Sequence, residues 1–186
     1  ALEGANSTVS NCNFENGRQA TYGSDLSVSQ AAGSVTTITG CDFRKSGFRG
    51  IMIWATGDEV KIDNCLFDNT YPFNCDAGTG KITVTDCELN GWTSYTNTVE
   101  VVTFTNCKFG KSTSGYAFLR PYCKTIITDC TFSSDFQINL NGSSTYTVEL
   151  INCKYEDGTA LGTAFIDADG FNPNATLIID GQTYRF

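Results

Sequence analysis

Histidine is absent from this chain of 186 residues, and proline and methionine are rare, with three and one residue. Without histidine, the chain cannot form the Ser-His or Cys-His pair that activates the nucleophile of many hydrolases. The commonest protein ligand of transition metals is missing for the same reason. These absences exclude two large classes of site, and we predict no metal centre.

Positive charge is scarce as well, with 12 Lys and Arg against 20 Asp and Glu and a net charge of −8. Such a chain has no basic patch that could displace the counterions of a phosphate backbone, so we expect no nucleic-acid partner. No apolar run reaches the roughly 18 residues of a membrane span, so we expect no membrane insertion either.

What the chain does have is a repeated phrase, Asn/Asp-Cys-x-aromatic, in which Gly40 replaces the first residue once and Leu89 the last residue once. The repeated cysteines are Cys12, Cys41, Cys65, Cys87, Cys107, Cys130 and Cys153. They follow one another at intervals of 20 to 29 residues, a spacing typical of stacked solenoid repeats. The repeat runs from about residue 7 to residue 155 without a linker, so we predict one domain.

Nine cysteines in a chain of this length would usually suggest a disulfide framework. Seven of them share one repeat position, however, and would stack on rungs about 4.8 Å apart, whereas a disulfide needs Cβ atoms about 3.8 Å apart. One thiol per rung along a straight line also cannot surround a metal ion tetrahedrally. We therefore expect free, buried thiols that act as small hydrophobic groups, and the same for Cys75 and Cys123.

The residues before each repeated cysteine alternate in polarity, as on a strand with one buried face. Apolar residues stand three places before the cysteines: Val9, Ile38, Ile62, Val84, Phe104, Ile127 and Leu150. The Asn, Asp or Gly directly before each cysteine breaks the alternation, and these types tolerate a left-handed backbone. We predict a bend there, with amides that hydrogen-bond from rung to rung and a short second strand beyond it.

A third strand is expected eight to ten residues beyond the cysteine, so that each turn has three sides. It is recognisable in Ile51–Trp54, Phe73–Asp76, Ala117–Arg120 and Ile138–Asn141. In Ala117–Arg120 the inward side stays open between Phe118 and the pair Ala117 and Leu119, and the direction of Arg120 depends on that choice.

The recurrence of strand, asparagine bend and second strand in register resembles the right-handed parallel β-helix of the pectate-lyase-like superfamily. The resemblance covers about residues 7–155 and implies an all-β, single-stranded right-handed coil of about 7–8 rungs, each of 20–29 residues. Residues 156–186 lack the phrase and are expected to form a degenerate last rung and a C-terminal cap. No comparable cap is visible at the other end, so we expect residues 1–186 to be part of a longer protein.

In the resembled superfamily, ligands lie on the outside of the third strand and on the loops entering it. Carried over to this sequence, that face offers aromatic rings, amides, carboxylates and one arginine. Rings stack on the faces of sugar rings, and the polar groups bind hydroxyls. The predicted ligand-binding residues are Trp54, Asn74, Asp76, Arg120, Tyr122, Asn139 and Asn141. The alternative is that Trp54 and Tyr122 only cover the ends of the wall.

A catalytic use of the same face would need further groups. A polysaccharide lyase would need a Ca²⁺ site of several carboxylates and a basic residue, for which Asp76 and Arg120 are the candidates, roughly 10 Å apart along the axis. A glycoside hydrolase would need carboxylates about 5–10 Å apart, for which Asp167 and Asp169 are the candidates. Neither set is complete, so we predict no catalytic residue and no cofactor.

The sequence thus favours a non-catalytic module that binds a polysaccharide or the glycan of a glycoprotein, in a secreted, cell-surface or virion-surface protein. Three alternatives stay open. The chain could be a lyase or hydrolase, or a structural spacer such as a phage tail fibre, which would be a homotrimer rather than a monomer. Outward columns of threonine also resemble the ice-binding faces of some antifreeze proteins, although threonine is an ordinary residue of exposed strands.

Overall fold

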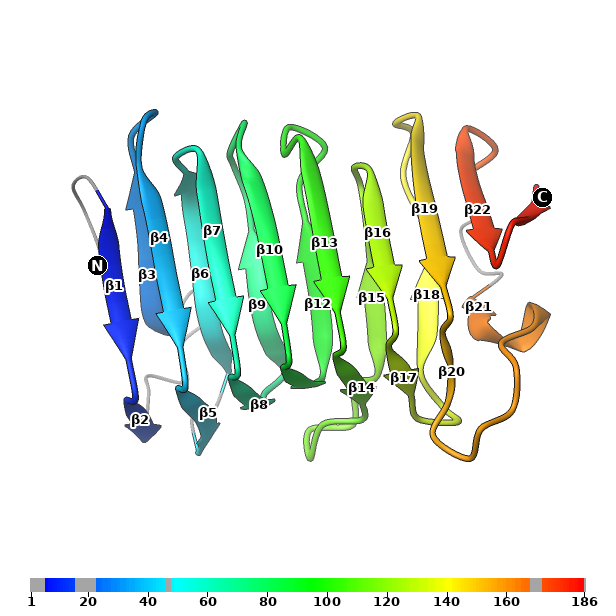
Figure 1. Cartoon of the computed structure of the whole chain (residues 1–186), viewed down its shortest axis with the longest axis horizontal. Helices are drawn as coiled ribbons and strands as arrows, with labels where there is room; N and C mark the ends of the chain where they lie inside the picture. Colours follow the sequence, from blue (N-terminus) through cyan, green and yellow to red (C-terminus); the bar gives the residue numbers. More distant parts are fainter. Residues whose placement is uncertain (1–5, 16–22, 46–47, 168–171, 186) are drawn as a thin grey trace.

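The computed structural model describes residues 6–15, 23–45, 48–167 and 172–185, and it shows a coil made of three sheets (Figure 1). Sheet I contains β1 (Ser7–Ser10), β4 (Val35–Thr39), β7 (Glu59–Asp63), β10 (Lys81–Thr85), β13 (Val101–Thr105), β16 (Thr125–Thr128), β19 (Tyr146–Ile151), β22 (Ala175–Ile179) and β23 (Gln182–Tyr184). Sheet II contains β2 (Asn13–Glu15), β5 (Asp42–Lys45), β8 (Leu66–Asp68), β11 (Glu88–Asn90), β14 (Lys108–Gly110), β17 (Thr131–Phe132) and β20 (Lys154–Tyr155). Sheet III contains β3 (Ser24–Gln30), β6 (Arg49–Thr56), β9 (Tyr71–Cys75), β12 (Trp92–Tyr95), β15 (Phe118–Arg120), β18 (Gln137–Asn139) and β21 (Ile166–Asp167), and η1 (Thr163–Phe165) is a short 3-10 turn.

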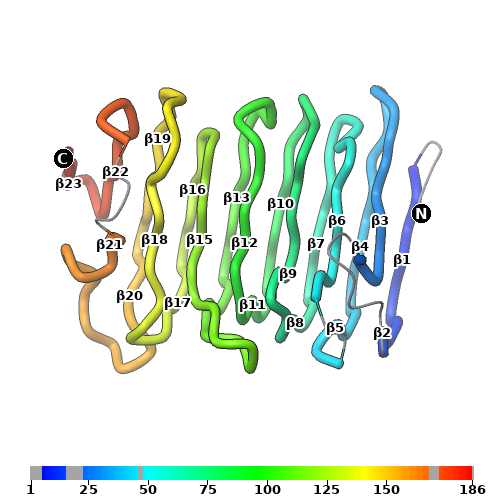
Figure 2. Tube along the Cα trace, turned by 180° about the vertical axis from the view of Figure 1, so that it is seen from behind, coloured from blue at the N-terminus to red at the C-terminus, as the bar shows by residue number. Residues whose placement is uncertain are grey.

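The chain visits sheets I, II and III in that order and then returns to sheet I one level further along (Figures 1 and 2). Strands of successive levels pair in parallel, and β23 returns antiparallel on β22. The path from β1 to the equivalent strand β19 makes six complete turns, and β20, β21 and β22 extend it. The predicted all-β parallel coil with three strands per turn is confirmed, while its right-handed sense stays a prediction.

The corner between sheets I and II lies at the residue that precedes each repeated cysteine. All seven of these residues have a left-handed backbone, with φ between 48° and 62°: Asn11, Gly40, Asn64, Asp86, Asn106, Asp129 and Asn152. Their side chains also bond along the axis, since Asn106 Nδ2 donates to Asp86 Oδ1 and Asn152 Nδ2 donates to Asp129 Oδ1. The predicted bend is confirmed, and it explains why only Asn, Asp and Gly occupy this position.

The nine cysteines are free thiols, and eight of them are buried. At the corners, each thiol donates to the carbonyl two residues earlier, as from Cys65 to Asp63 O at 3.2 Å and from Cys87 to Thr85 O at 3.1 Å. The thiol therefore also satisfies a carbonyl at the bend. Cys12 is only half-buried because β2 is the edge strand of sheet II, so the prediction of buried free thiols is confirmed for all but this one.

The interior is filled by columns of similar side chains, one from each turn. The apolar residues three places before the cysteines are fully buried from Ile38 to Leu150, whereas Val9 on the edge strand β1 is half-buried. On sheet II, the rings of Phe109 and Phe132 stack with centroids 4.8 Å apart. The alternation in the sequence therefore gave the correct inward face of sheet I.

Buried thiols should make the fold sensitive to alkali. Burial raises the pKa of Cys75 and of Cys123 from 9.0 to about 12. Above pH 9 the unfolded chain ionises these thiols while the folded chain does not, so the free energy of unfolding falls as pH rises from 9 towards 12. The loss is at most about 1.4 kcal/mol per thiol and pH unit.

Urea unfolding at pH 8 and at pH 10.5 measures this effect. We expect a lower midpoint at pH 10.5 and a smaller pH dependence in the Cys75→Ala, Cys123→Ala double variant. The same pH dependence in wild type and double variant would show that these thiols do not titrate as described.

Candidate functional site

The outer face of sheet III carries a column of mostly polar residues, one from each strand between β6 and β21, which we call the polar column. Its members are Met52, Asn74, Ser94, Arg120, Asn139 and Asp167, as the strand register shows. Leu119 is fully buried, so Phe118 and Arg120 point outward. This settles the side of β15 that the sequence left open.

A second set of outward residues, which we call the aromatic row, lies at the amino ends of the same strands. It consists of Phe48, Tyr71, Trp92, Tyr116 and Phe118. Ring centroids are 5.0 Å apart for Phe48 and Tyr71, 4.9 Å for Tyr71 and Trp92, and 4.7 Å for Trp92 and Phe118. Tyr116 comes from the loop before β15 and is 39% exposed. Rings from four successive turns of sheet III thus form one continuous, partly exposed surface.

Two arginines lie against this row, one near each end. The Arg49 guanidinium lies 4.8 Å from the Phe48 ring centroid and 5.0 Å from that of Tyr71. The Arg120 guanidinium lies 4.7 Å from the Trp92 ring centroid. Such contacts hold a cation against the electron-rich ring face. The outer face of sheet III therefore combines apolar rings with fixed positive charge, although the chain as a whole is acidic.

Two shielded N–H groups at the centre of the row, Trp92 Nε1 and Arg120 Nε, have no hydrogen-bond partner among the described residues. Most buried donors in folded proteins are paired, so two unpaired donors in stacked side chains are unusual. Either donor could serve an oxygen atom of a bound molecule.

The polar column holds three of the residues predicted from the sequence, Asn74, Arg120 and Asn139. Asn74 and Asn139 are only 7% and 6% exposed, and both are already hydrogen-bonded to neighbouring side chains. Asn74 Oδ1 accepts from Arg49 Nε at 3.0 Å, and Asn139 Nδ2 donates to Asp167 Oδ2 at 2.7 Å. These amides support the charged groups beside them rather than reach into solvent.

Trp54 and Asp76 lie at the other end of the same face. Trp54 is 43% exposed and sits in an irregularity where Val28 pairs with Ile53 and Ser29 pairs with Ala55. Asp76 follows β9 on the next turn, and its N–H donates to Ile53 O at 3.0 Å. Trp54 stands five positions after Arg49, which is about 16 Å along a strand. The exposed tryptophan is therefore remote from the aromatic row, and it makes no ring contact among the described residues.

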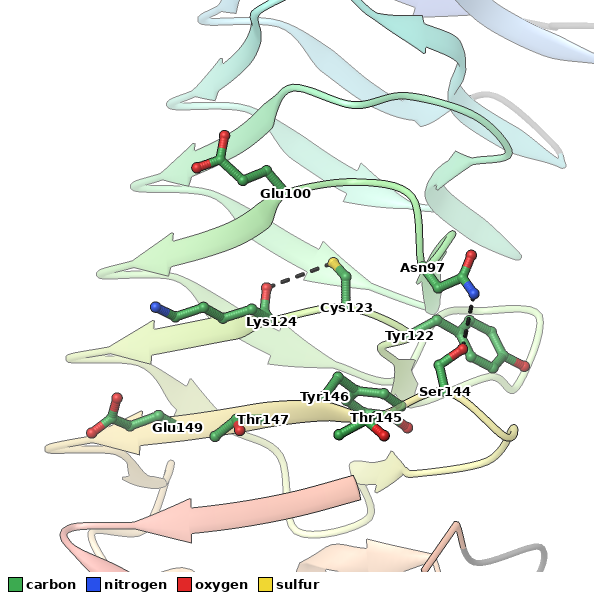
Figure 3. A pocket seen from close by; sticks show the side chains of 10 residues that line it. All are labelled: Asn97, Glu100, Tyr122, Cys123, Lys124, Ser144, Thr145, Tyr146, Thr147 and Glu149. Carbon is green, nitrogen blue, oxygen red and sulfur yellow. Dashed lines mark hydrogen bonds between the residues drawn. The ribbon is translucent and has the colours of Figure 1, made fainter. Parts of the chain in front are cut away.

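Tyr122 lies at the turn between sheets III and I and shares a hollow of about 430 Å³ with Asp76, Asn97 and Ser144. A larger hollow of about 820 Å³ shares Asn97, Tyr122 and Ser144 with it, and its lining includes the bond from Asn97 Nδ2 to Ser144 Oγ, 2.9 Å long (Figure 3). Asn141 shapes the neighbouring turn, where its Oδ1 accepts from the Gly142 N–H at 2.6 Å. The structure thus brings Asp76 and Tyr122 to one hollow, and Arg120 is not among the residues that line it.

The candidate catalytic residues do not form a cluster. Asp76 follows β9 while Arg120 ends β15, with β12 between them. Asp167 accepts a hydrogen bond from Asn139, and Asp169 lies outside the described residues. Among the residues that the structure describes, no group of three or more Cys, Asp or Glu is placed to hold a metal ion.

Sequence reasoning predicted none of the five members of the aromatic row as binding residues, and it named Phe118 only as a residue that could point inward. A partial signal was present, since Tyr71 and Trp92 stand six and five residues after their cysteines. Phe118 stands eleven residues after its cysteine, so no fixed spacing identifies the row.

In the part of the chain that the structure describes, no helix has the length and apolar character needed to cross a bilayer. Comparison with known proteins gave no match to this chain among family models, curated proteins or solved structures.

Proposed function

We propose that this chain is a non-catalytic module that binds a polysaccharide or the glycan of a glycoprotein along the outer face of sheet III. The observation that carries the proposal is the aromatic row, in which neighbouring ring centroids are 4.7 to 5.0 Å apart over successive turns. Parallel strands repeat about every 4.8 Å, and a sugar ring is of similar length. In a linear glycan that lies along the axis, each sugar ring would therefore meet about one aromatic side chain.

The polar groups beside the row suit such a ligand. The Arg120 guanidinium now lies on the Trp92 ring. If a glycan displaced it, the oxygen atoms of the glycan could accept hydrogen bonds from both unpaired donors, Arg120 Nε and Trp92 Nε1. Hydroxyl and carboxylate oxygens both accept from these groups, and a carboxylate would add a charge-assisted bond. Arg49 offers a second cation near the other end of the row.

The fold context is part of the same proposal. We assign the coil to the pectate-lyase-like superfamily with its right-handed sense, in a secreted, cell-surface or virion-surface protein that acts as a monomer. What supports a non-catalytic role is that Asp76 and Arg120 stand on turns with β12 between them. Incubation with uronate polysaccharides, with and without calcium, should release no new reducing or unsaturated ends.

Electrophoresis through gels that contain a polysaccharide tests the proposal. The panel comprises xylan, galactomannan, polygalacturonate and alginate. We expect at least one of them to retard the wild-type protein, and Arg120→Ala to weaken that retardation about tenfold, since a charge-assisted hydrogen bond contributes about 1.5–3 kcal/mol. Arg44→Ala is the matched control, because Arg44 pairs with Asp42 on sheet II, away from the row.

Unretarded migration of the wild type in all four gels would contradict the proposal. Aromatic and arginine side chains are also common at the centres of protein interfaces. If the wild type is unretarded and sediments as a trimer that Trp92→Ala dissociates, the row is a subunit interface and the spacer alternative holds.

A further inference from the structure

The connection between β14 and β15, residues 111–117, leaves its own turn and reaches backward along the coil (Figure 1). On the preceding turn, Gly91 alone connects β11 to β12. That corner is tight, because a Cβ on Gly91 would lie 2.2 Å from Asn69 O. The short corner leaves room for the longer loop to cross it.

Beyond that corner, the loop is fastened to the turn that carries β8 and β9. Asp68 Oδ1 accepts from the Thr113 N–H at 2.7 Å and from Thr113 Oγ1 at 3.3 Å. Thr70 Oγ1 donates to Ser114 Oγ at 3.1 Å. The partners are 44 and 45 residues apart in sequence, so the contact is purely tertiary.

This attachment determines where Tyr116 lies. Inside the loop, Ser112 N donates to Tyr116 O at 2.9 Å and Gly115 N donates to Ser112 O at 2.8 Å, so the tip is one compact turn. The Tyr116 ring then lies beside the aromatic row, with its centroid 6.1 Å from that of Trp92 and 6.4 Å from that of Tyr71. The row is thereby two rings wide at this point.

We infer that Asp68 is a positioning residue, whose carboxylate holds the loop so that Tyr116 widens the aromatic row and strengthens glycan binding. The inference rests on the proposed function. Asp68 accepts two bonds from one loop residue, and a carboxylate is the stronger kind of acceptor. A further tether, between Lys111 Nζ and Asp135 Oδ2 at 3.1 Å, lies at the base of the loop, and both side chains are about half exposed.

A ligand-free measurement tests the positioning itself. In a Trp54→Phe background, Trp92 is the single tryptophan, since the chain has two. We expect Asp68→Ala to increase acrylamide quenching of Trp92, because the loop no longer holds Tyr116 against it. Asp68→Asn keeps an acceptor oxygen. Asp135→Ala breaks the tether at the base and the bond from Ser133 Oγ but leaves the bonds to Asp68 in place, so both variants should quench like the background protein. Unchanged quenching in Asp68→Ala would overturn the inference.

The four polysaccharide gels test the consequence for binding. Asp68→Ala and Tyr116→Ala should each bind about tenfold more weakly than wild type, a difference of about 1.4 kcal/mol. The double variant should lose no more than either single one, because both changes remove the same ring contact. If the wild type is retarded and Asp68→Ala is retarded equally, the inference is wrong while the proposed function stands. If the wild type is not retarded in any gel, both fail.

Discussion

Replacing Trp92 by alanine is expected to weaken binding to the retarding polysaccharide by roughly 30-fold, or about 2 kcal/mol. Trp92 is the central ring of the aromatic row and contacts the rings of Tyr71, Tyr116 and Phe118. The Arg120 guanidinium also stacks on it. The substitution therefore removes the largest ring surface and leaves Arg120 without its support. Affinity electrophoresis with a concentration series of polysaccharide measures the loss.

Trp54→Ala is the matched control for this experiment. It removes the other tryptophan from the same face of sheet III, four residues and so about 13 Å further along the strands. We expect Trp54→Ala to bind within about twofold of wild type, since surface changes away from a contact have effects near zero. An equal loss in both variants, or a larger loss in Trp54→Ala, would move the site to the carboxyl ends of the strands, near Asp76 and Tyr122.

Replacing Phe109 by alanine is expected to lower the free energy of unfolding by about 3–5 kcal/mol. The Phe109 ring is 1% exposed and packs against the rings of Phe104, Phe132 and Phe136, with centroids 4.8 to 5.3 Å away. Its removal leaves a cavity between three turns, and a coil that is held together by neighbour contacts has few ways to refill it. The midpoint of urea unfolding measures the change.

Phe14→Ala makes the corresponding change at the edge of the coil. Phe14 holds the same place in the repeated phrase but is half-buried and stacks only on Phe43 among the described residues. We expect it to cost about 1 kcal/mol, near the centre of the distribution for single substitutions. Equal losses for the two phenylalanines would mean that stacking between turns contributes little to stability.

The corner between sheets I and II could be predicted from the sequence because it has a single backbone requirement. Only a few residue types tolerate a left-handed conformation, and the chain meets the requirement seven times with Asn, Asp or Gly. Cysteine follows because a small apolar side chain fits inside the bend and its thiol satisfies a carbonyl there, as Cys65 does for Asp63. A local rule repeated in register therefore predicted the fold.

The aromatic row obeys no such local rule. It forms because the connections from sheet II to sheet III differ in length, from Gly91 alone to residues 111–117. Rings at unequal sequence distances from their cysteines therefore reach the same end of the strands of sheet III. Tyr116 comes from a loop that is fastened to Asp68 on a different turn. These placements depend on tertiary contacts, which a pattern of spacing does not contain.

Trp54 was predicted as a site residue for the opposite reason, because an exposed tryptophan on the third strand is conspicuous in the sequence. The pairing of β3 with β6 contains an irregularity between Val28 and Ser29, and Trp54 falls opposite it. Asn74 and Asn139 were placed correctly on the outer face, but both are buried, and each is already hydrogen-bonded to a charged side chain of a neighbouring turn. The sequence predicted which side of these strands faces outward, but it did not predict the contacts between side chains of neighbouring turns.

The two tryptophans give the most direct test of where the ligand lies. In Trp54→Phe the fluorescence reports on Trp92 in the aromatic row, and in Trp92→Phe it reports on Trp54. Each protein is titrated with the polysaccharide that retards the wild type, and acrylamide quenching is measured at every step. A glycan on the aromatic row should protect Trp92 from quenching and leave Trp54 unchanged. Protection of Trp54 with no change at Trp92 would contradict the assignment of the site to the aromatic row.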